Sequence, residues 1–445
     1  MSSSGSERLT SELAPRSEGR ADARGTELGV GDHVPTETTT CCIVGCGPAG
    51  AMLGLLLARA GVAVVVLEKY PDFFRDFRGD TIHASTLQVL DELSLLEGFE
   101  RLPHQKASSI GVMTDEGTTV FGDFSTLPGK FDYVAMVPQW DFLDFITDEA
   151  RRYPSFALRQ RAEVFELIEE AGVVRGVRYR TEDGMRELRA ALTVACDGRH
   201  STVRHASGLT LTEFGAPMDV LWYRISRRET DPAGSFLRLA PGKLLPMIDR
   251  GTYWQGACTI PKGGFAELQA KGVEALRSDL RTYLPFLAER VDEIKGWDDV
   301  GFLEVRVNRL RRWHRPGLLC IGDAAHAMSP IGGVGINLAI QDAVAAANLL
   351  AEPLRRGTVS EEGLARVQRR RSAPTRLTQR VQLFMQRNLI SAVLANKASA
   401  AVPWRLRLAL RLPFLRRWFP TFLAIGVRNE HVRTGIAAPP STGTK

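Results

Sequence analysis

The sequence predicts an α/β fold with an inserted β-sheet and a helical C-terminal region. Residues 38–69 have the pattern of a strand, a glycine-rich turn, a helix and a second strand, which is one βαβ unit. Residues 205–305 alternate apolar and polar residues as strands do. The α/β pattern then returns with an apolar run at 318–322 and helical spacing at 336–350 and about 361–395. We therefore expect one α/β domain, interrupted by a second sheet.

The remaining elements follow in chain order. Helical spacing predicts a helix at 83–98, and short strands are expected within 108–135. The segment "QWDFLDFITDEARR", residues 139–152, predicts an amphipathic helix. A strand pair near 162–182 leads to "RAALTVACDGRHSTVR" at 189–204, in which Ser201 and Arg204 are expected to begin a helix.

Composition excludes several classes of protein. The 445 residues are 44% hydrophobic and 24% charged, with a net charge of +6, as in an ordinary globular protein, so no nucleic-acid partner is expected. The six cysteines form no Cys-x-x-Cys pair, which predicts buried thiols in a reducing, cytoplasmic setting and no metal site. Residues 1–37 are expected to form a disordered extension without a signal peptide, and no apolar stretch is expected to span a bilayer.

The turn "GCGPAG" supplies Gly45, Gly47 and Gly50 between the first strand and the first helix. The first glycine permits the tight turn, the second lets a pyrophosphate approach the main chain, and the third lets helix and strand pack closely. Glu68 ends the second strand about 20 residues on, where an acid can hold a ribose diol. The alternative is a tight turn with incidental glycines. This unit predicts a dinucleotide site but does not separate FAD from NAD.

Two later apolar runs also end on acids. Asp197 follows "LTVAC", and Asp323 follows "LLCIG". The turn after Asp323 is bare, with Gly333 and Gly335 before a helix that is expected to begin near Ile336-Asn337. Because the carboxyl ends of parallel strands share one edge of a sheet, the three segments predict a single extended ligand there. A bare turn at a helix start suits a flat, anionic ring such as a reduced flavin.

These motifs resemble the class A flavoprotein monooxygenases, the para-hydroxybenzoate hydroxylase family. The matching stretches are "GCGPAG", "FRDFRGDTIHASTLQVL", "VPQWDFLDFI", "CDGRHSTVR" and "GDAAHAMSPIGGVGINLAIQDA", in order, between about residues 38 and 375. The resemblance implies an FAD-binding, Rossmann-like domain of the glutathione reductase type. It assigns Arg78 and Gln139 to the cofactor, places Asp197 near the flavin and the path of the nicotinamide, and includes Asn337 in the last motif.

The resemblance also implies a reaction and a division of the chain. NADPH or NADH would reduce FAD, and a C4a-hydroperoxide formed with O2 would hydroxylate or epoxidise a hydrophobic aromatic or polycyclic molecule. The FAD-binding domain would comprise 38–110, 131–205 and 306–375, and the substrate-binding sheet 111–130 and 206–305. Residues 376–445 would form a helical, basic C-terminal region.

Several alternatives stay open. The basic, apolar segment 403–428 suits either peripheral membrane contact or packing on its own domain. That segment also suits a reductase or dehydrogenase of a lipid-like substrate, resembling geranylgeranyl reductases, and a flavin-loaded binding protein is a third reading. His83 is expected to contact ligand or to be structural, whereas a structural role is favoured for His326. One or two of the aromatic residues Trp222, Tyr223, Tyr253 and Trp254 should touch substrate. No residue has the pattern of a catalytic base.

Overall fold

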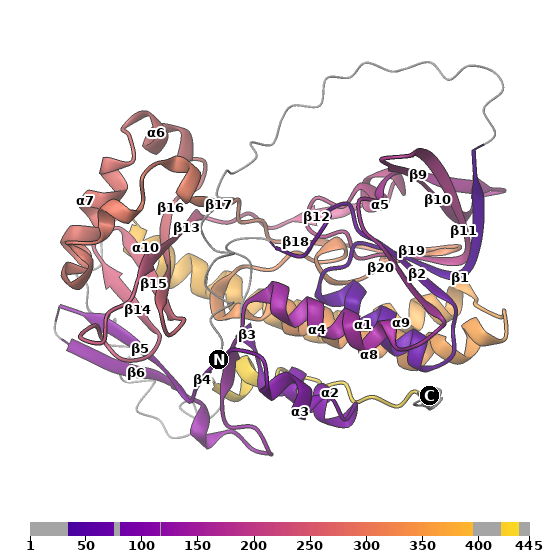
Figure 1. Ribbon diagram of the computed structural model, residues 1–445, viewed down its shortest axis with the longest axis horizontal. Coiled ribbons are helices and arrows are strands. Elements are labelled where there is room, and N and C mark those ends of the chain that lie inside the picture. The colour runs from indigo at the N-terminus through magenta and orange to yellow at the C-terminus, as the bar shows by residue number, and fades with distance from the viewer. Residues whose placement is uncertain (1–33, 75–80, 116, 395–419, 436–445) are drawn as a thin grey trace, which may run out of the picture.

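The computed structural model of the protein describes residues 34–74, 81–115, 117–394 and 420–435. Two lobes lie side by side in Figure 1, one built on an eight-stranded sheet and the other on a seven-stranded sheet. The predicted α/β fold with an inserted sheet and a helical C-terminal region is confirmed. Most of the predicted extension, up to residue 33, lies outside the described residues.

The first sheet has a parallel centre, and its strands are buried runs of apolar residues. All four residues of β2 (Val64–Leu67), "VVVL", are buried, as expected for a parallel strand covered on both faces. The antiparallel strands β10 (Val173–Thr181) and β9 (Glu163–Glu170) extend β11 (Gly184–Ala195) to one side. In sheet order the strands are β19 (His314–Arg315), β20 (Leu318–Cys320), β11 (Gly184–Ala195), β1 (Thr36–Val44), β2 (Val64–Leu67) and β8 (Phe156–Arg159).

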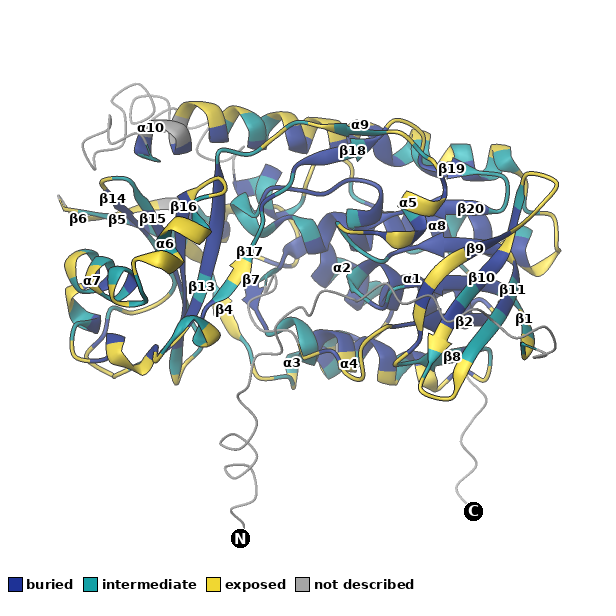
Figure 2. Cartoon of the chain, turned by 90° about the horizontal axis from the view of Figure 1, so that it is seen from above, coloured by how far each residue is buried: buried dark blue, intermediate teal, exposed yellow. Residues whose placement is uncertain are grey.

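A layer of helices packs under this sheet in Figure 1. It contains α1 (Pro48–Arg59), α4 (Gln139–Arg151), α8 (Gly335–Arg355) and α9 (Glu361–Met385). Helix α1 is buried at almost every position, which explains why it is apolar on all sides (Figure 2). The segment Ile331–Arg355 is long and apolar enough to cross a membrane, contrary to the expectation from sequence. However, 72% of its apolar window is buried inside the protein, so it serves here as a core helix.

The second sheet joins two segments that are far apart in the chain. Residues 109–123 supply its edge, and residues 218–303 supply the rest. Neighbouring strands are antiparallel except for the parallel pair β14 (Phe236–Ala240) and β5 (Ser109–Thr114). In order, the strands are β17 (Gly301–Leu303), β13 (Met218–Ser226), β16 (Tyr253–Pro261), β15 (Lys243–Asp249), β14 (Phe236–Ala240), β5 (Ser109–Thr114) and β6 (Gly117–Asp123).

Residues 265–299 differ from the β-like pattern expected for 205–305. They form α6 (Phe265–Ala270), α7 (Glu274–Tyr283) and three short 3-10 turns, which cover one face of the second sheet. Helix α7 buries Leu276 and Leu280, four residues apart on one face, so its period is helical. The layer is fixed to the sheet by the buried ion pair of Arg290 and Asp231, whose N–O distance is 2.6 Å.

The C-terminal segment and several short elements complete the fold. Residues 420–435 pack against the first lobe, where Glu430 forms an ion pair with Arg370 at 2.8 Å and Ala424 is fully buried. The rest of the basic segment, 403–419, lies outside the described residues. The remaining short elements are β3 (Thr81–Ile82), α2 (Ala84–Glu92), α3 (Leu96–Glu100), β4 (Gln105–Ala107), β7 (Val134–Met136), α5 (Thr202–Ala206), β12 (Leu211–Glu213), β18 (Asn308–Leu310) and α10 (Ser391–Leu394).

Candidate cofactor and substrate site

Strand register brings the three predicted motifs to one place. Val44 of β1 lies beside Ala195 of β11, and Ala195 lies beside Cys320 of β20. Val44 is also paired with Leu67, which precedes Glu68. The glycine turn, the Asp197 loop, the Asp323 loop and Glu68 therefore leave the same carboxyl edge of the sheet. This edge is where open α/β sheets bind ligands.

Each glycine of the first turn has a different reason to lack a side chain. Gly45 has φ +92°, and a Cβ there would lie 2.6 Å from the carbonyl oxygen of Cys196. A Cβ on Gly50 would lie 2.0 Å from the carbonyl oxygen of Gly45. A Cβ on Gly47 would meet nothing within 4 Å. Protein packing thus explains Gly45 and Gly50, whereas Gly47 faces open space at the start of α1.

Glu68 supports this turn from the neighbouring strand. Its carboxylate is buried and accepts hydrogen bonds from the main-chain N–H of Cys46 at 2.8 Å and of Tyr70 at 3.2 Å. The carboxylate therefore holds the glycine turn against β2. Its contact with a ribose stays a prediction.

Asp197 faces the protein. Its carboxylate accepts hydrogen bonds from the Ser201 hydroxyl at 2.5 Å and from the N–H of Val203 at 3.1 Å, at the start of α5. Burial raises the pKa of Asp197 above its ordinary value, although these hydrogen bonds act in the opposite direction. Its side chain thus shapes the Asp-Gly loop, and Gly198 and Arg199 of that loop reach the cavity.

Asp323 faces the cavity and has a cationic neighbour. Its carboxylate oxygen lies 3.4 Å from Nη2 of Arg199, and its side chain is 28% exposed. Arg204 links the same two loops, since its guanidinium donates to the carbonyl oxygen of Ala324 at 3.0 Å and to that of Arg199 at 2.7 Å. The two acidic loops are therefore held as one rigid wall.

The bare turn after Pro330 contacts a distant segment of the chain. Gly333 has φ +62°, and a Cβ there would lie 2.3 Å from the Thr81 hydroxyl. Gly335 is the first residue of α8, and a Cβ there would meet nothing within 4 Å, as at Gly47. Asn337 is buried; its Oδ1 accepts from the N–H of His83 at 2.9 Å, and its Nδ2 donates to the carbonyl of Thr81 at 3.1 Å. Asn337 therefore cross-links the turn to residues 81–83.

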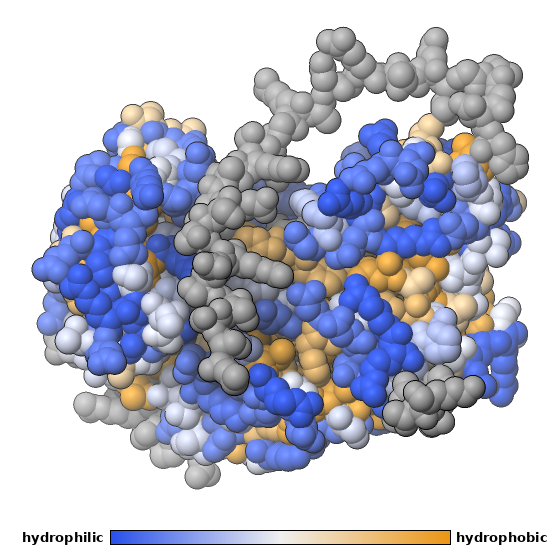
Figure 3. Space-filling view, viewed as in Figure 1, coloured by the Kyte–Doolittle hydropathy of each residue, from blue (hydrophilic) through white to orange (hydrophobic). Residues whose placement is uncertain are grey.

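A cavity of about 520 Å³ connects these loops with the second sheet. Five of the predicted site residues line it: Gly47, Gln139, Asp323, Gly333 and Gly335. Gly45, Gly50, Glu68, Asp197 and Asn337 lie behind its wall, and Arg78 lies outside the described residues. In Figure 3, apolar side chains gather in the hollow between the two lobes. The sheet contributes Ile110, Val112, Met218, Val220, Trp222, Leu237, Leu239, Leu244, Pro246, Ile248, Ala257, Thr259 and Leu303.

Alternation along the strands decides which aromatic side chains face the cavity. Val220 and Trp222 of β13 line it, whereas Leu221 and Tyr223 pack under the helical layer in a separate core with Trp254. Tyr253 lies beneath the guanidinium of Arg224, 3.8 Å from the ring centroid. Of the four aromatic residues singled out from sequence, Trp222 is the one that lines the cavity.

His326 belongs to a buried network behind the Asp323 loop. Its Nε2 lies 2.6 Å from Asp342, whose other oxygen accepts from Arg371 at 2.8 Å. Although burial acts to raise it, the pKa of Asp342 is lowered by the charges and hydrogen bonds of His326 and Arg371. The network ties the loop to α8 and α9, which agrees with the structural role favoured from sequence.

Comparison with known proteins agrees with this geometry. A family model described as "FAD binding domain" matches residues 37–381. The chain is 36% identical over 382 residues to 6-methylpretetramide 4-monooxygenase of Streptomyces rimosus, covering 85% of this chain and 90% of that one. The chain belongs to the class A flavoprotein monooxygenases. This monooxygenase is also 30% identical over 319 residues to rifampicin monooxygenase of Streptomyces venezuelae, covering 68% of this chain and 61% of the relative.

Solved structures share the fold of this monooxygenase at lower identity. A probable FAD-dependent monooxygenase from Pseudomonas aeruginosa has a TM-score of 0.68 and 23% identity, over 81% of this chain and 98% of that one. Anhydrotetracycline hydroxylase from Streptomyces rimosus has a TM-score of 0.69 and 23% identity, over 88% and 77%. The cofactor of this monooxygenase is FAD, with NAD(P)H as co-substrate, and its further substrates are O2 and a small molecule.

The residues present fit FAD, because the cavity reaches from the open N-terminus of α1 to the bare turn before α8. Sequence reasoning missed Thr81, Met328 and Leu423, which also line this cavity. No sequence motif marks Leu423, because its segment reaches the cavity from the far end of the chain. Thr81 lies inside a stretch that resembles the family, and its contact with Gly333 depends on the fold.

Proposed function

We propose that this monooxygenase hydroxylates a phenolic, polycyclic aromatic compound of the polyketide type in secondary metabolism. The observation that carries the proposal is the single cavity that adjoins Gly47, Asp323 and Gly335 on one side and an apolar sheet face on the other. Its polar lining is sparse, as expected for a pocket that takes a flat, largely apolar ligand. The relatives named for 6-methylpretetramide and anhydrotetracycline support a fused-ring substrate.

Each wall of the cavity has a separate task in this proposal. The N-terminus of α1, beside Gly47, would hold the pyrophosphate of FAD with free N–H groups and a partial positive charge. Asp323 would accept a hydrogen bond from the ribityl chain. The turn at Gly333 and Gly335 would lie against the ring, where the N-terminus of α8 favours negative charge.

The remaining walls serve the substrate. Bound FAD supplies the activation of O2 and the transfer of one oxygen atom. The sheet face that carries Val220, Trp222 and Leu303 would hold the aromatic rings and exclude water. Peripheral membrane contact through 403–428 stays a prediction, as does a cytoplasmic location. The described residues 420–428 pack on the first lobe, and no specific observation favours the lipid reductase alternative.

The test is oxygen incorporation. The purified protein should be yellow with FAD, and should consume NAD(P)H and O2 when given 6-methylpretetramide or anhydrotetracycline. Under 18O2, the product should gain one labelled oxygen atom. NAD(P)H oxidation without oxygen incorporation would favour the reductase reading. Conversion without NAD(P)H or O2 would count against a monooxygenase reaction.

A further inference from the structure

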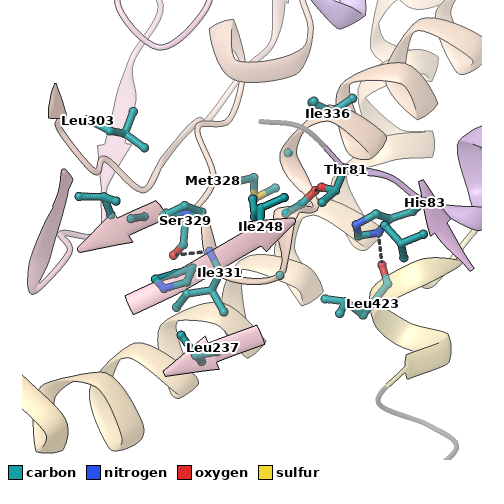
Figure 4. Close-up of a pocket in the computed structure, with 18 of the residues that line it drawn as sticks. Thr81, His83, Leu237, Ile248, Leu303, Met328, Ser329, Ile331, Ile336 and Leu423 are labelled. Carbon is teal, nitrogen blue, oxygen red and sulfur yellow. Dashed lines mark hydrogen bonds between the residues drawn. The ribbon is translucent and has the colours of Figure 1, made fainter. Parts of the chain in front are cut away.

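His83 lies in the cavity wall at the start of α2. The residue is 2% exposed and lines the cavity beside Thr81, next to the bare turn before α8. Figure 4 shows its ring between Thr81 and Leu423. The main chain of His83 is fixed as well, because its N–H donates to Asn337. Both the position and the backbone of this residue are therefore set by neighbours from two distant segments.

The ring of His83 has one possible tautomer when it is neutral. Its Nδ1 lies 2.8 Å from the main-chain carbonyl oxygen of Leu423 (Figure 4). A carbonyl oxygen only accepts hydrogen bonds, so Nδ1 carries the proton and Nε2 keeps a free lone pair. Burial lowers the pKa of His83 to about 4, so the ring is neutral near pH 7. The C-terminal segment thus fixes both the orientation of the imidazole and the side that accepts.

Nε2 is an acceptor without a partner in the part of the chain that the structure describes. No described residue hydrogen-bonds to it, and it is not one of the fully buried polar atoms. Neighbouring hydroxyls already donate to other acceptors: Thr81 to the carbonyl oxygen of Gly333 at 2.9 Å, and Thr86 to Oδ1 of Asn337 at 2.7 Å. A ligand that buries this acceptor without supplying a donor would lose about 1–3 kcal/mol, so a ligand that supplies a donor is favoured.

We propose that Nε2 of His83 accepts a hydrogen bond from a hydroxyl group of the aromatic substrate and so orients the ring in the cavity. The inference rests on the function proposed above and adds a named substrate contact. Phenols have a pKa of about 10, far above that of this imidazole, so the proton stays on the substrate oxygen. His83 is therefore a specificity-determining residue and not a general base. A ligand in which the hydroxyl is methylated cannot make this bond.

The test compares two substitutions in the FAD-loaded enzyme. His83→Asn keeps an amide N–H near the position of Nδ1, for the Leu423 carbonyl, but has no acceptor near Nε2. His83→Gln can place an amide oxygen near the position of Nε2. The probes are 2,6-dihydroxyanthraquinone and its dimethyl ether, and the dissociation constant of each is measured from flavin absorbance without NAD(P)H. His205→Asn, on the exposed face of α5, is the matched control.

We expect the wild type and His205→Asn to prefer the phenol over the ether by about tenfold. His83→Asn should lose this preference, and His83→Gln should recover part of it. If His83 had only a structural role, His83→Asn should bind the probes at least as tightly as His83→Gln. The proposal is overturned if His83→Asn keeps the preference, if the wild type shows none, or if the variants change the FAD dissociation constant instead. Oxygen incorporation by the wild type is measured separately, so failure of the proposed function is recognised independently.

Discussion

Substituting Gly47 with Val should separate cofactor binding from folding. Gly47 has φ −73° and ψ −174°, an extended conformation that Val adopts readily, and a Cβ there meets nothing within 4 Å. Losing glycine's freedom in the unfolded chain stabilises by about 0.4–1 kcal/mol, and placing Val at a helix N-cap costs a similar amount. The free energy of unfolding of the protein without FAD should therefore change by less than about 1 kcal/mol.

The effect of Gly47→Val on FAD binding should be much larger than its effect on folding. A branched side chain at Gly47 would fill the space through which a pyrophosphate reaches the free N–H groups of Ala49 and Gly50. Each charge-assisted hydrogen bond contributes about 1.5–3 kcal/mol, so losing both weakens binding by roughly a hundredfold to ten-thousandfold.

The assay pairs urea unfolding of the cofactor-free protein with titration of FAD by calorimetry. Gly50→Val is the contrasting variant, because its Cβ would lie 2.0 Å from the Gly45 carbonyl oxygen and should prevent folding. If Gly47→Val were purified yellow, with an FAD dissociation constant like that of the wild type, Gly47 would not adjoin the cofactor, and the assignment of this end of the cavity would be wrong.

Three further predictions follow from the site. Asp323→Ala should weaken FAD binding about tenfold because it removes an acceptor, whereas Asp323→Asn keeps an acceptor oxygen and should retain most of the FAD affinity. Equal FAD release from both variants on ultrafiltration would count against the ribityl contact. Arg371→Leu should lower the free energy of unfolding by about 3–5 kcal/mol, because Asp342 is left buried with one cationic partner fewer, and a loss below 1 kcal/mol in urea would contradict this role. Burial lowers the pKa of His83 from 6.5 to about 4, so the unfolded chain binds this proton first as the pH falls. At 1.36 kcal/mol per unit, up to roughly 3 kcal/mol of stability should be lost between about pH 6.5 and pH 4. His83→Asn should not show this part of the loss, and parallel pH–stability curves for the two proteins would refute the assignment.

In the C-terminal half of the second lobe, the structure differs from what the alternation of apolar and polar residues predicts. Alternation correctly indicated the strands of 218–261, but residues 265–299 fold as a helical layer. Alternation also does not tell which face of a strand a residue will cover. Trp222 and Tyr223 are neighbours in sequence, yet one lines the cavity and the other is buried in a separate core, because the helical layer covers only one face of the sheet.

The predicted site residues divide in a similar way. A motif marks a residue that matters to the site, but it does not say whether the side chain meets ligand or protein. Asp197 and Asp323 both end a buried strand at the same edge, and both are acids. Asp197 turns inward to the start of α5, whereas Asp323 faces the cavity beside Arg199. Gly47 and Gly50 differ for the same reason, since only the fold determines what lies opposite each Cβ.

Local sequence alone determined the βαβ unit, its glycine turn and the acids that end the strands, because these depend on residues close together in the chain. It also identified the family, since the motifs keep their order and spacing. The tertiary structure decided that strand register would bring Gly47, Gly198 and Asp323 to one edge, and that Leu423 would reach His83 from 340 residues away. Contacts between distant segments depend on how whole layers pack, and no short stretch of sequence encodes that packing.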